Sequence, residues 1–70
     1  MAELNVDEFL ARFRERAEAV RERGIPPLEG DARRAYVAQM ETDFTDYSLV
    51  GAAEWAVEDG ALVLRIPLGG

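Results

Sequence analysis

The hydrophobic pattern of the chain changes its period, from helical spacing in the N-terminal part to strict alternation near the C-terminus. The first helical stretch predicts a helix over Val6–Arg23, because its apolar residues fill one stripe: Val6, Phe9, Leu10, Phe13, Ala17 and Val20. Asn5 is the expected N-cap, and Gly24 followed by a Pro-Pro pair ends the helix. We expect this stripe to lie on the core.

A second helix is expected after the connector Ile25–Gly30, with Asp31 as its N-cap. Its narrower stripe consists of Ala32, Tyr36, Val37, Met40 and Phe44. The acidic stretch 41–46 is expected to end the helix in a loop. For Tyr47–Ala53 we prefer a strand with a bulge at Gly51, which would lengthen the following strand. A short third helix capped by Asp46 is the alternative.

Alternation from Glu54 to Ile66, interrupted by Asp59-Gly60, predicts a β-hairpin. A two-residue turn fixes the register, in which Glu54 faces Arg65. One face of the hairpin then carries Ala53, Trp55, Val57, Leu62, Leu64 and Ile66. We expect the first helix to cover this face and to bury Trp55, so that truncating Trp55 to Ala costs about 3 to 5 kcal/mol.

Together these elements predict one small α+β domain over residues 1–70, in the order α-α-β-β. Two N-terminal helices pack on a C-terminal antiparallel β-hairpin that a partner chain can complete. Seventy residues bury only about 60% of the unfolded surface, so any contact with another chain matters for folding.

The hairpin's reverse face is also apolar, which indicates an interface with a protein partner or with a second copy of the chain. Its apolar positions include Ala56 and Val63, and the preferred longer strand would leave Tyr47 and Leu49 without a ladder neighbour. Arg33 and Arg34 join these candidates, because positive charge in the first turn of a helix opposes its dipole. Exposed arginines without a role are the simpler interpretation of that pair.

The first helix alternates acidic and basic residues on its outer side. We expect ion pairs at i,i+4 spacing, between Glu8 and Arg12 and between Arg14 and Glu18. A docking strip for an acidic partner is the alternative, formed by Arg12, Arg16 and Arg23.

A net charge of −6 argues against binding to nucleic acid or anionic membranes, both of which need a basic surface. We therefore expect protein partners. No apolar run approaches the roughly 20 residues of a membrane span, and the acidic N-terminus does not resemble a signal peptide. A cytoplasmic location is expected, and the lack of cysteine fits a reducing compartment.

The residue types that usually perform catalysis are scarce. The chain has no His, no Cys and no Lys, and its single Ser48 has no conventional base. The acidic stretch 41–46 lacks the Gly and the closing Glu of a calcium loop. We expect no enzymatic activity, no cofactor and no metal site.

The last nine residues, Leu62–Gly70, form a strand and a tail that ends in Gly69-Gly70. This ending resembles the tails of ubiquitin-like proteins and small sulfur carriers. The resemblance implies a carrier whose terminal Gly70 is activated as an adenylate. The predicted element order differs from the β-grasp order of those families.

The leading prediction is a non-catalytic accessory or interaction protein, such as a minor subunit of a larger enzyme complex, that docks through its hairpin face or edge. The carrier is the first alternative. An acidic inhibitor that mimics nucleic acid is the second, and it ranks last because the carboxylates of the first helix alternate with arginines.

Overall fold

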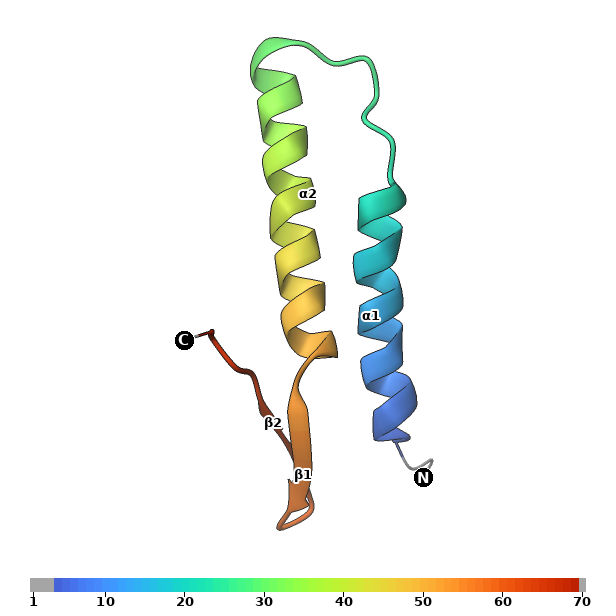
Figure 1. The fold of residues 1–70 in the computed structure, drawn as a ribbon, viewed down its shortest axis with the longest axis vertical. Helices are drawn as coiled ribbons and strands as arrows, with labels where there is room; N and C mark the ends of the chain where they lie inside the picture. The colour runs from blue at the N-terminus through green and yellow to red at the C-terminus, as the bar shows by residue number, and fades with distance from the viewer. Residues whose placement is uncertain (1–3, 70) are drawn as a thin grey trace.

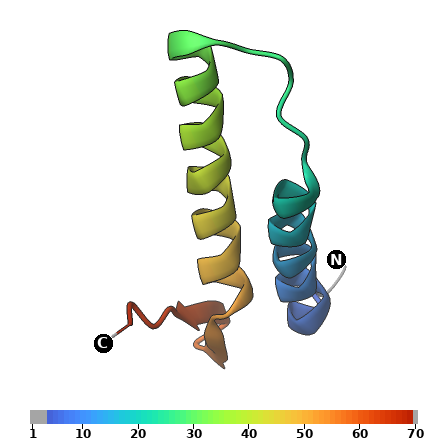
Figure 2. The ribbon, with the colours of Figure 1, turned by 45° about the horizontal axis from the view of Figure 1, so that its top comes forward.

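The computed structural model describes residues 4–69. Two helices, α1 (Val6–Glu22) and α2 (Gly30–Gly51), precede two strands, β1 (Glu54–Glu58) and β2 (Ala61–Arg65). The helices run antiparallel, and the hairpin continues beyond the C-terminal end of α2 (Figure 1). Figure 2 shows the hairpin at the C-terminal end of α2 from a second direction. The predicted α+β order α-α-β-β is therefore confirmed.

Helix α1 begins as predicted. The Glu8 backbone N–H donates to Asn5 Oδ1 at 3.0 Å, so Asn5 is the N-cap, and Asp7 and Glu8 in the first turn favour the helix dipole. The helix ends one residue earlier than expected, with Arg23 as an extended C-cap whose N–H donates to the Val20 carbonyl at 3.1 Å.

Helix α2 differs from the prediction at both ends. It begins at Gly30, so Asp31 lies in the first turn and is not the N-cap. The helix also passes through the acidic stretch 41–46 and ends only at Gly51. The preferred strand over Tyr47–Ala53 is therefore wrong, and so is the bulge at Gly51. The helical alternative was closer, although Asp46 caps nothing because the helix is continuous there.

The hairpin has the predicted register in all five of its pairs, from Glu54 with Arg65 to Glu58 with Ala61. Asp59 and Gly60 both have positive φ, 51° and 75°, as a two-residue turn requires. Ala53 and Ile66 lie just outside the strands.

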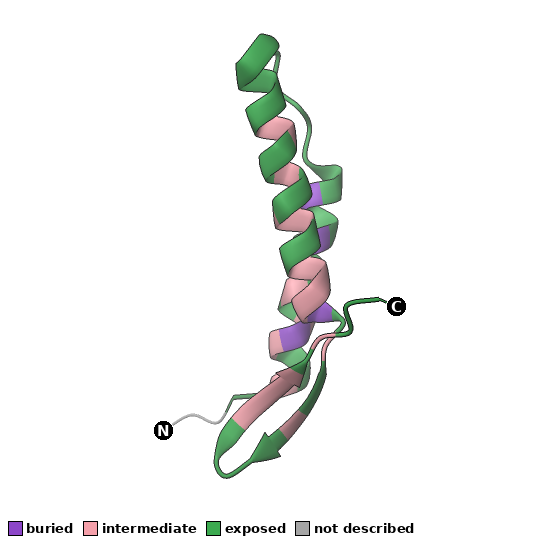
Figure 3. Cartoon of the chain, turned by 90° about the vertical axis from the view of Figure 1, so that its left-hand side faces the viewer, coloured by how far each residue is buried: buried purple, intermediate pink, exposed green. Residues whose placement is uncertain are grey.

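The hairpin lies outside the helix pair, contrary to the expectation that α1 would cover it. Helix packs on helix and strand on strand. Trp55 and Val57 remain 42% and 62% exposed, so the expected burial of Trp55 is wrong. Figure 3 shows buried residues only along the helix pair and none in the hairpin. The core consists of Leu10, Ala17 and Val20 of α1, and Gly51 of α2 is also buried.

The chain is open for its size. Its accessible surface is 5537 Å², whereas a compact protein of 7.8 kDa exposes about 4,400 Å². Its radius of gyration is 15.6 Å, and a compact domain of this length has about 11 Å. Within residues 4–69, no helix is long and apolar enough to cross a membrane.

Candidate interaction surface

The two helices are in close contact where α2 ends, and this contact fixes the point from which the hairpin leaves. A Cβ added at Gly51 would lie 2.6 Å from Arg14 Cγ and 3.2 Å from the Arg14 backbone nitrogen. Arg14 Nη1 also donates a hydrogen bond of 2.7 Å to the Gly51 carbonyl oxygen. Arg14 therefore satisfies a free carbonyl at the negative end of the α2 dipole.

An aromatic cluster lies between the helices towards the N-terminus of α1. The Phe9 and Phe13 rings are 5.2 Å apart between centroids, and the Phe13 and Tyr47 rings are 6.0 Å apart. All three residues are half-buried. The guanidinium groups of Arg12 and Arg16 lie over Phe9 and Phe13, at 5.7 and 5.0 Å from the ring centroids.

These contacts replace the expected ion pairs of α1. Within residues 4–69, Glu18 pairs with Arg21 at 3.6 Å, and Arg14 bonds to the Gly51 carbonyl. The predicted pairs of Glu8 with Arg12 and of Arg14 with Glu18 are therefore wrong. Both kinds of contact contribute little at an exposed site, about 1 kcal/mol or less each. Arg23 at the end of α1 reaches Asp43 of α2 at 3.5 Å.

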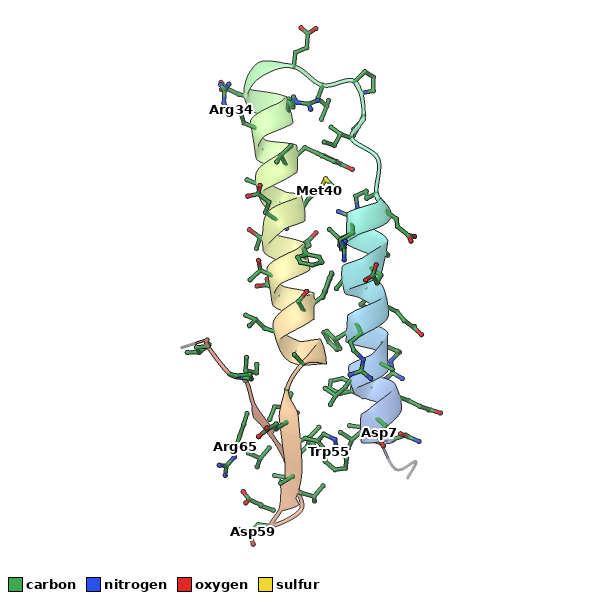
Figure 4. The ribbon with its side chains drawn as sticks, viewed as in Figure 1. Asp7, Arg34, Met40, Trp55, Asp59 and Arg65 are labelled. Carbon is green, nitrogen blue, oxygen red and sulfur yellow. The ribbon has the colours of Figure 1, made fainter. Side chains whose placement is uncertain are left out.

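The hairpin has one apolar face and one face that mixes apolar and charged residues. We call the face with Ala53, Trp55, Val57, Leu62, Leu64 and Ile66 the hairpin front, and the face with Glu54, Ala56, Glu58, Ala61, Val63 and Arg65 the hairpin back. Figure 4 shows the Trp55 side chain pointing from β1 towards the N-terminal end of α1, where Asp7 lies. Trp55 and Val57 are exposed, whereas Leu62 and Leu64 are half-buried.

The structure brings together some of the interface residues predicted from sequence. Ala56 and Val63 are cross-strand partners in the centre of the hairpin back, and both are half-buried. Tyr47 joins the aromatic cluster and Leu49 is half-buried, both on the last turns of α2 rather than on a strand edge.

Arg33 and Arg34 lie apart from the other candidates, at the opposite end of α2 from the hairpin (Figure 4). The Arg34 side chain contacts Asp31 one turn earlier, and both side chains are well exposed. The six predicted residues therefore do not form a single surface.

Sequence reasoning missed a groove between the helices. Two adjoining depressions, of about 450 and 280 Å³, share Phe44 as a wall. Their other walls are Arg14, Ala17, Glu18, Val20, Arg21, Met40, Glu41, Thr45, Ser48 and Ala52. A helical interpretation of residues 41–51 would have placed Met40, Phe44 and Ser48 on one face and indicated this groove.

The described part of the chain shows no cluster of three or more acidic, His or Cys residues that could hold a metal ion. The C-terminal tail is open: Leu68 is 88% exposed and Gly69 has φ of 80°. Gly70, which the carrier interpretation requires, lies outside the described residues.

These features define a small α+β chain whose helix pair holds the core and whose hairpin stands free. Comparisons of the chain with protein families, with curated proteins and with solved structures give no match.

Proposed function

We propose that this protein is a non-catalytic interaction protein that serves as an accessory subunit of a larger protein complex and docks through its hairpin. The observation that carries the proposal is the exposure of Trp55 and Val57, at 42% and 62%, on a strand that lies outside the helix pair (Figure 1). Large apolar side chains clustered on a short free sheet are typical of a protein interface.

The size of the open surface supports the same function. The chain exposes about 1,100 Å² more than a compact protein of its mass. Each partner in a standard interface buries about 800 Å². The surface to be covered is therefore large enough for a specific complex.

The residue types near the hairpin also suit binding to protein. Aromatic residues and arginine are enriched among the residues that dominate binding energy at interfaces. Trp55, Tyr47 and the arginines that cover Phe9 and Phe13 are of these types.

The acidic charge favours a protein partner over nucleic acid or anionic lipid, because both of these attract basic surfaces. The absence of His, Cys and Lys from the sequence supports a role without catalysis. We place this role in the cytoplasm, for which the lack of cysteine is the supporting feature.

The test compares two serine substitutions at exposed apolar residues. Val57→Ser changes the hairpin front, and the matched control Ile25→Ser changes the connector between α1 and α2, where Ile25 is 43% exposed. The tagged chains are crosslinked in the source cell, and the attached proteins are identified by mass spectrometry. We expect one partner complex with the wild type and with Ile25→Ser, and its loss with Val57→Ser.

Retention of the same partner by Val57→Ser would show that the hairpin front is not the docking surface. Absence of any partner from the wild-type chain would contradict the accessory role.

A carrier function is the second candidate, favoured by the exposed tail at Leu68 and Gly69. Mass spectrometry of the native C-terminus tests it, because a carrier shows a thiocarboxylate or an isopeptide bond there. A plain carboxylate in every preparation would exclude the carrier.

A further inference from the structure

The hairpin has two outer strand edges, one on β1 and one on β2. The residues of the two edges differ in whether they allow pairing with a second copy of the same strand. In an antiparallel ladder, the residues that flank a two-residue turn exchange hydrogen bonds, and every second residue beyond them does the same. With the observed register, the backbone groups of Trp55 and Val57 therefore point to the outer edge of β1, and those of Leu62 and Leu64 point to the outer edge of β2.

The β1 edge is unsuitable for pairing with a copy of itself. An antiparallel β1 pair centred on Ala56 places Glu54 of each chain directly opposite Glu58 of the other. Two pairs of like charges then face one another across neighbouring strands, which is destabilising. Figure 1 also shows β1 between β2 and α1, so α1 lies on the β1 side of the hairpin.

The β2 edge meets neither obstacle. An antiparallel β2 pair centred on Val63 places Leu62 opposite Leu64 of the other chain, and Ala61 opposite Arg65. No like charges meet. The outward N–H and C=O groups of Leu62 can bond to those of Leu64 on the second copy. In an antiparallel pair, two opposite residues exchange both hydrogen bonds when the backbone groups of both point to the shared edge, as they do here.

We propose that the partner at this edge is a second copy of the same chain, joined through β2 in a four-stranded antiparallel sheet of order β1-β2-β2′-β1′. This proposal rests on the proposed function and names its first partner. The two-fold axis passes beside Val63, which meets Val63 of the second copy.

The rows of side chains across this sheet bring residues of matching character together. On the hairpin front, two symmetric rows read Trp55, Leu64, then Leu62 and Val57 of the second copy, so every position is apolar. The central row of the hairpin back is Ala56, Val63 and the same two residues of the second copy. Apolar and β-branched cross-strand neighbours are the contacts that stabilise a sheet.

Each outer row of the hairpin back has one arginine between two glutamates. Glu58 and Ala61 of one chain continue into Arg65 and Glu54 of the other. Ala61 is too short to separate its neighbours, so the long Arg65 side chain can extend over it towards Glu58 of the second copy. The acidic hairpin thereby gains two attractive contacts between chains.

The open surface is large enough for one standard interface. The excess of about 1,100 Å² per chain is larger than the roughly 800 Å² that each partner contributes to a standard interface. Joining the hairpins through β2 doubles the hairpin front into one continuous apolar face. A larger protein can then dock on that face.

The absence of cysteine gives a direct test. In the proposed sheet, residue 63 faces itself in a pair without hydrogen bonds, at a Cα separation of about 4.5 Å, which suits a disulfide. Ala56 lies on the same face, but its copy is three strand spacings away, about 14 Å. Val63→Cys should therefore form a covalent dimer under mild oxidation at least about tenfold faster than the matched control Ala56→Cys.

Sedimentation of the wild type gives an independent readout. The expected mass is twice that of the 7.8 kDa chain. Val63→Lys and Val63→Glu should each give the single-chain mass, and a mixture of the two should restore the double mass, because only a residue that meets its own copy is rescued in this way. Circular dichroism of each variant verifies that it remains folded.

A single-chain mass for the wild type, or equal crosslinking rates for the two cysteine variants, would overturn the proposal. Faster crosslinking of Ala56→Cys would assign the pairing to β1 and would also overturn it. If the self-pairing is overturned in this way but Val57→Ser still loses a larger partner protein that the wild type binds, only the self-pairing fails and the proposed function stands. If self-pairing is found and no larger partner exists, the accessory role fails instead.

Discussion

Replacing Gly51 by alanine tests the close approach of the two helices, on which the position of the hairpin depends. The added Cβ would lie 2.6 Å from Arg14 Cγ, and 3.2 and 3.4 Å from the backbone nitrogen and Cα of Arg14. Arg14 Cγ is near the base of its side chain, which is itself held by the 2.7 Å hydrogen bond to the Gly51 carbonyl. The helices must therefore move apart, or Arg14 must give up this bond.

The expected loss of stability follows from two opposing effects. Forcing an extra carbon into a packed contact costs about 1 to 3 kcal/mol. Alanine is better than glycine within a helix by up to about 1 kcal/mol, and the Gly51 backbone is not in the left-handed region. The net loss should be about 1 to 2 kcal/mol, which lowers the melting temperature of a domain of this size by about 4 to 16 °C.

The assay is thermal unfolding followed by circular dichroism at one protein concentration. Gly24→Ala is the matched control, because a Cβ at Gly24 meets nothing within 4 Å. It should leave the melting temperature unchanged or raise it slightly. A second test repeats Gly51→Ala in an Arg14→Ala background, where the 2.6 Å contact cannot form and the loss should fall below about 1 kcal/mol.

Two results would refute the reasoning. A melting temperature for Gly51→Ala equal to that of Gly24→Ala would show that the helices are not in close contact at Gly51. An equal loss in both backgrounds would show that Arg14 is not the group that resists the added carbon.

Three further substitutions test the local structure, each by urea unfolding. Asn5→Ala removes the side-chain acceptor of the Glu8 N–H and should cost about 1 kcal/mol, whereas Asn5→Asp should preserve most of the stability. Gly60→Ala places a Cβ at φ of 75° and should cost about 1 kcal/mol, with Gly24→Ala again as the control. Trp55→Ala should cost about 2 kcal/mol, less than the 3 to 5 kcal/mol of a fully buried tryptophan, because Trp55 is 42% exposed; a loss above 4 kcal/mol would show that Trp55 is buried in solution.

The elements that the sequence predicted correctly are those with local and redundant signals. Helix α1 has an N-cap at Asn5, a single apolar stripe and a Pro-Pro stop, and these signals agree on one helix between them. The hairpin has a turn that accepts only a few residue types, and once Asp59 and Gly60 are placed the whole register follows. No contact between distant segments is needed for either prediction.

The second half of α2 was missed because its signals conflict. Tyr47, Leu49 and Val50 favour a strand by propensity, and Gly51 suggests a bulge. The helix persists because Phe44 and Tyr47 continue its stripe towards α1 and Gly51 allows a close approach at Arg14. Tertiary contacts therefore outweigh local propensity here, and a single sequence does not reveal them.

The candidate interface residues were placed correctly only in part. Two apolar hairpin faces indicated an interface, and Ala56 and Val63 do lie together in its centre. Tyr47 and Leu49 entered that prediction through a strand that does not exist. The groove at Phe44 and the stacking of Arg12 and Arg16 were missed because both depend on how the helices pack.

The way in which the two helices pack also explains why the hairpin lies outside the helix pair. The stripe of α1 packs against α2, through Leu10, Ala17 and Val20, so α1 has no second apolar side to offer the strands. The outer side of α1 is charged, and its arginines cover the aromatic rings that remain. A two-stranded sheet is marginal in water unless other strands or a packed face support it. Under the proposed function, that support comes from another chain, and folding of the hairpin is then coupled to association.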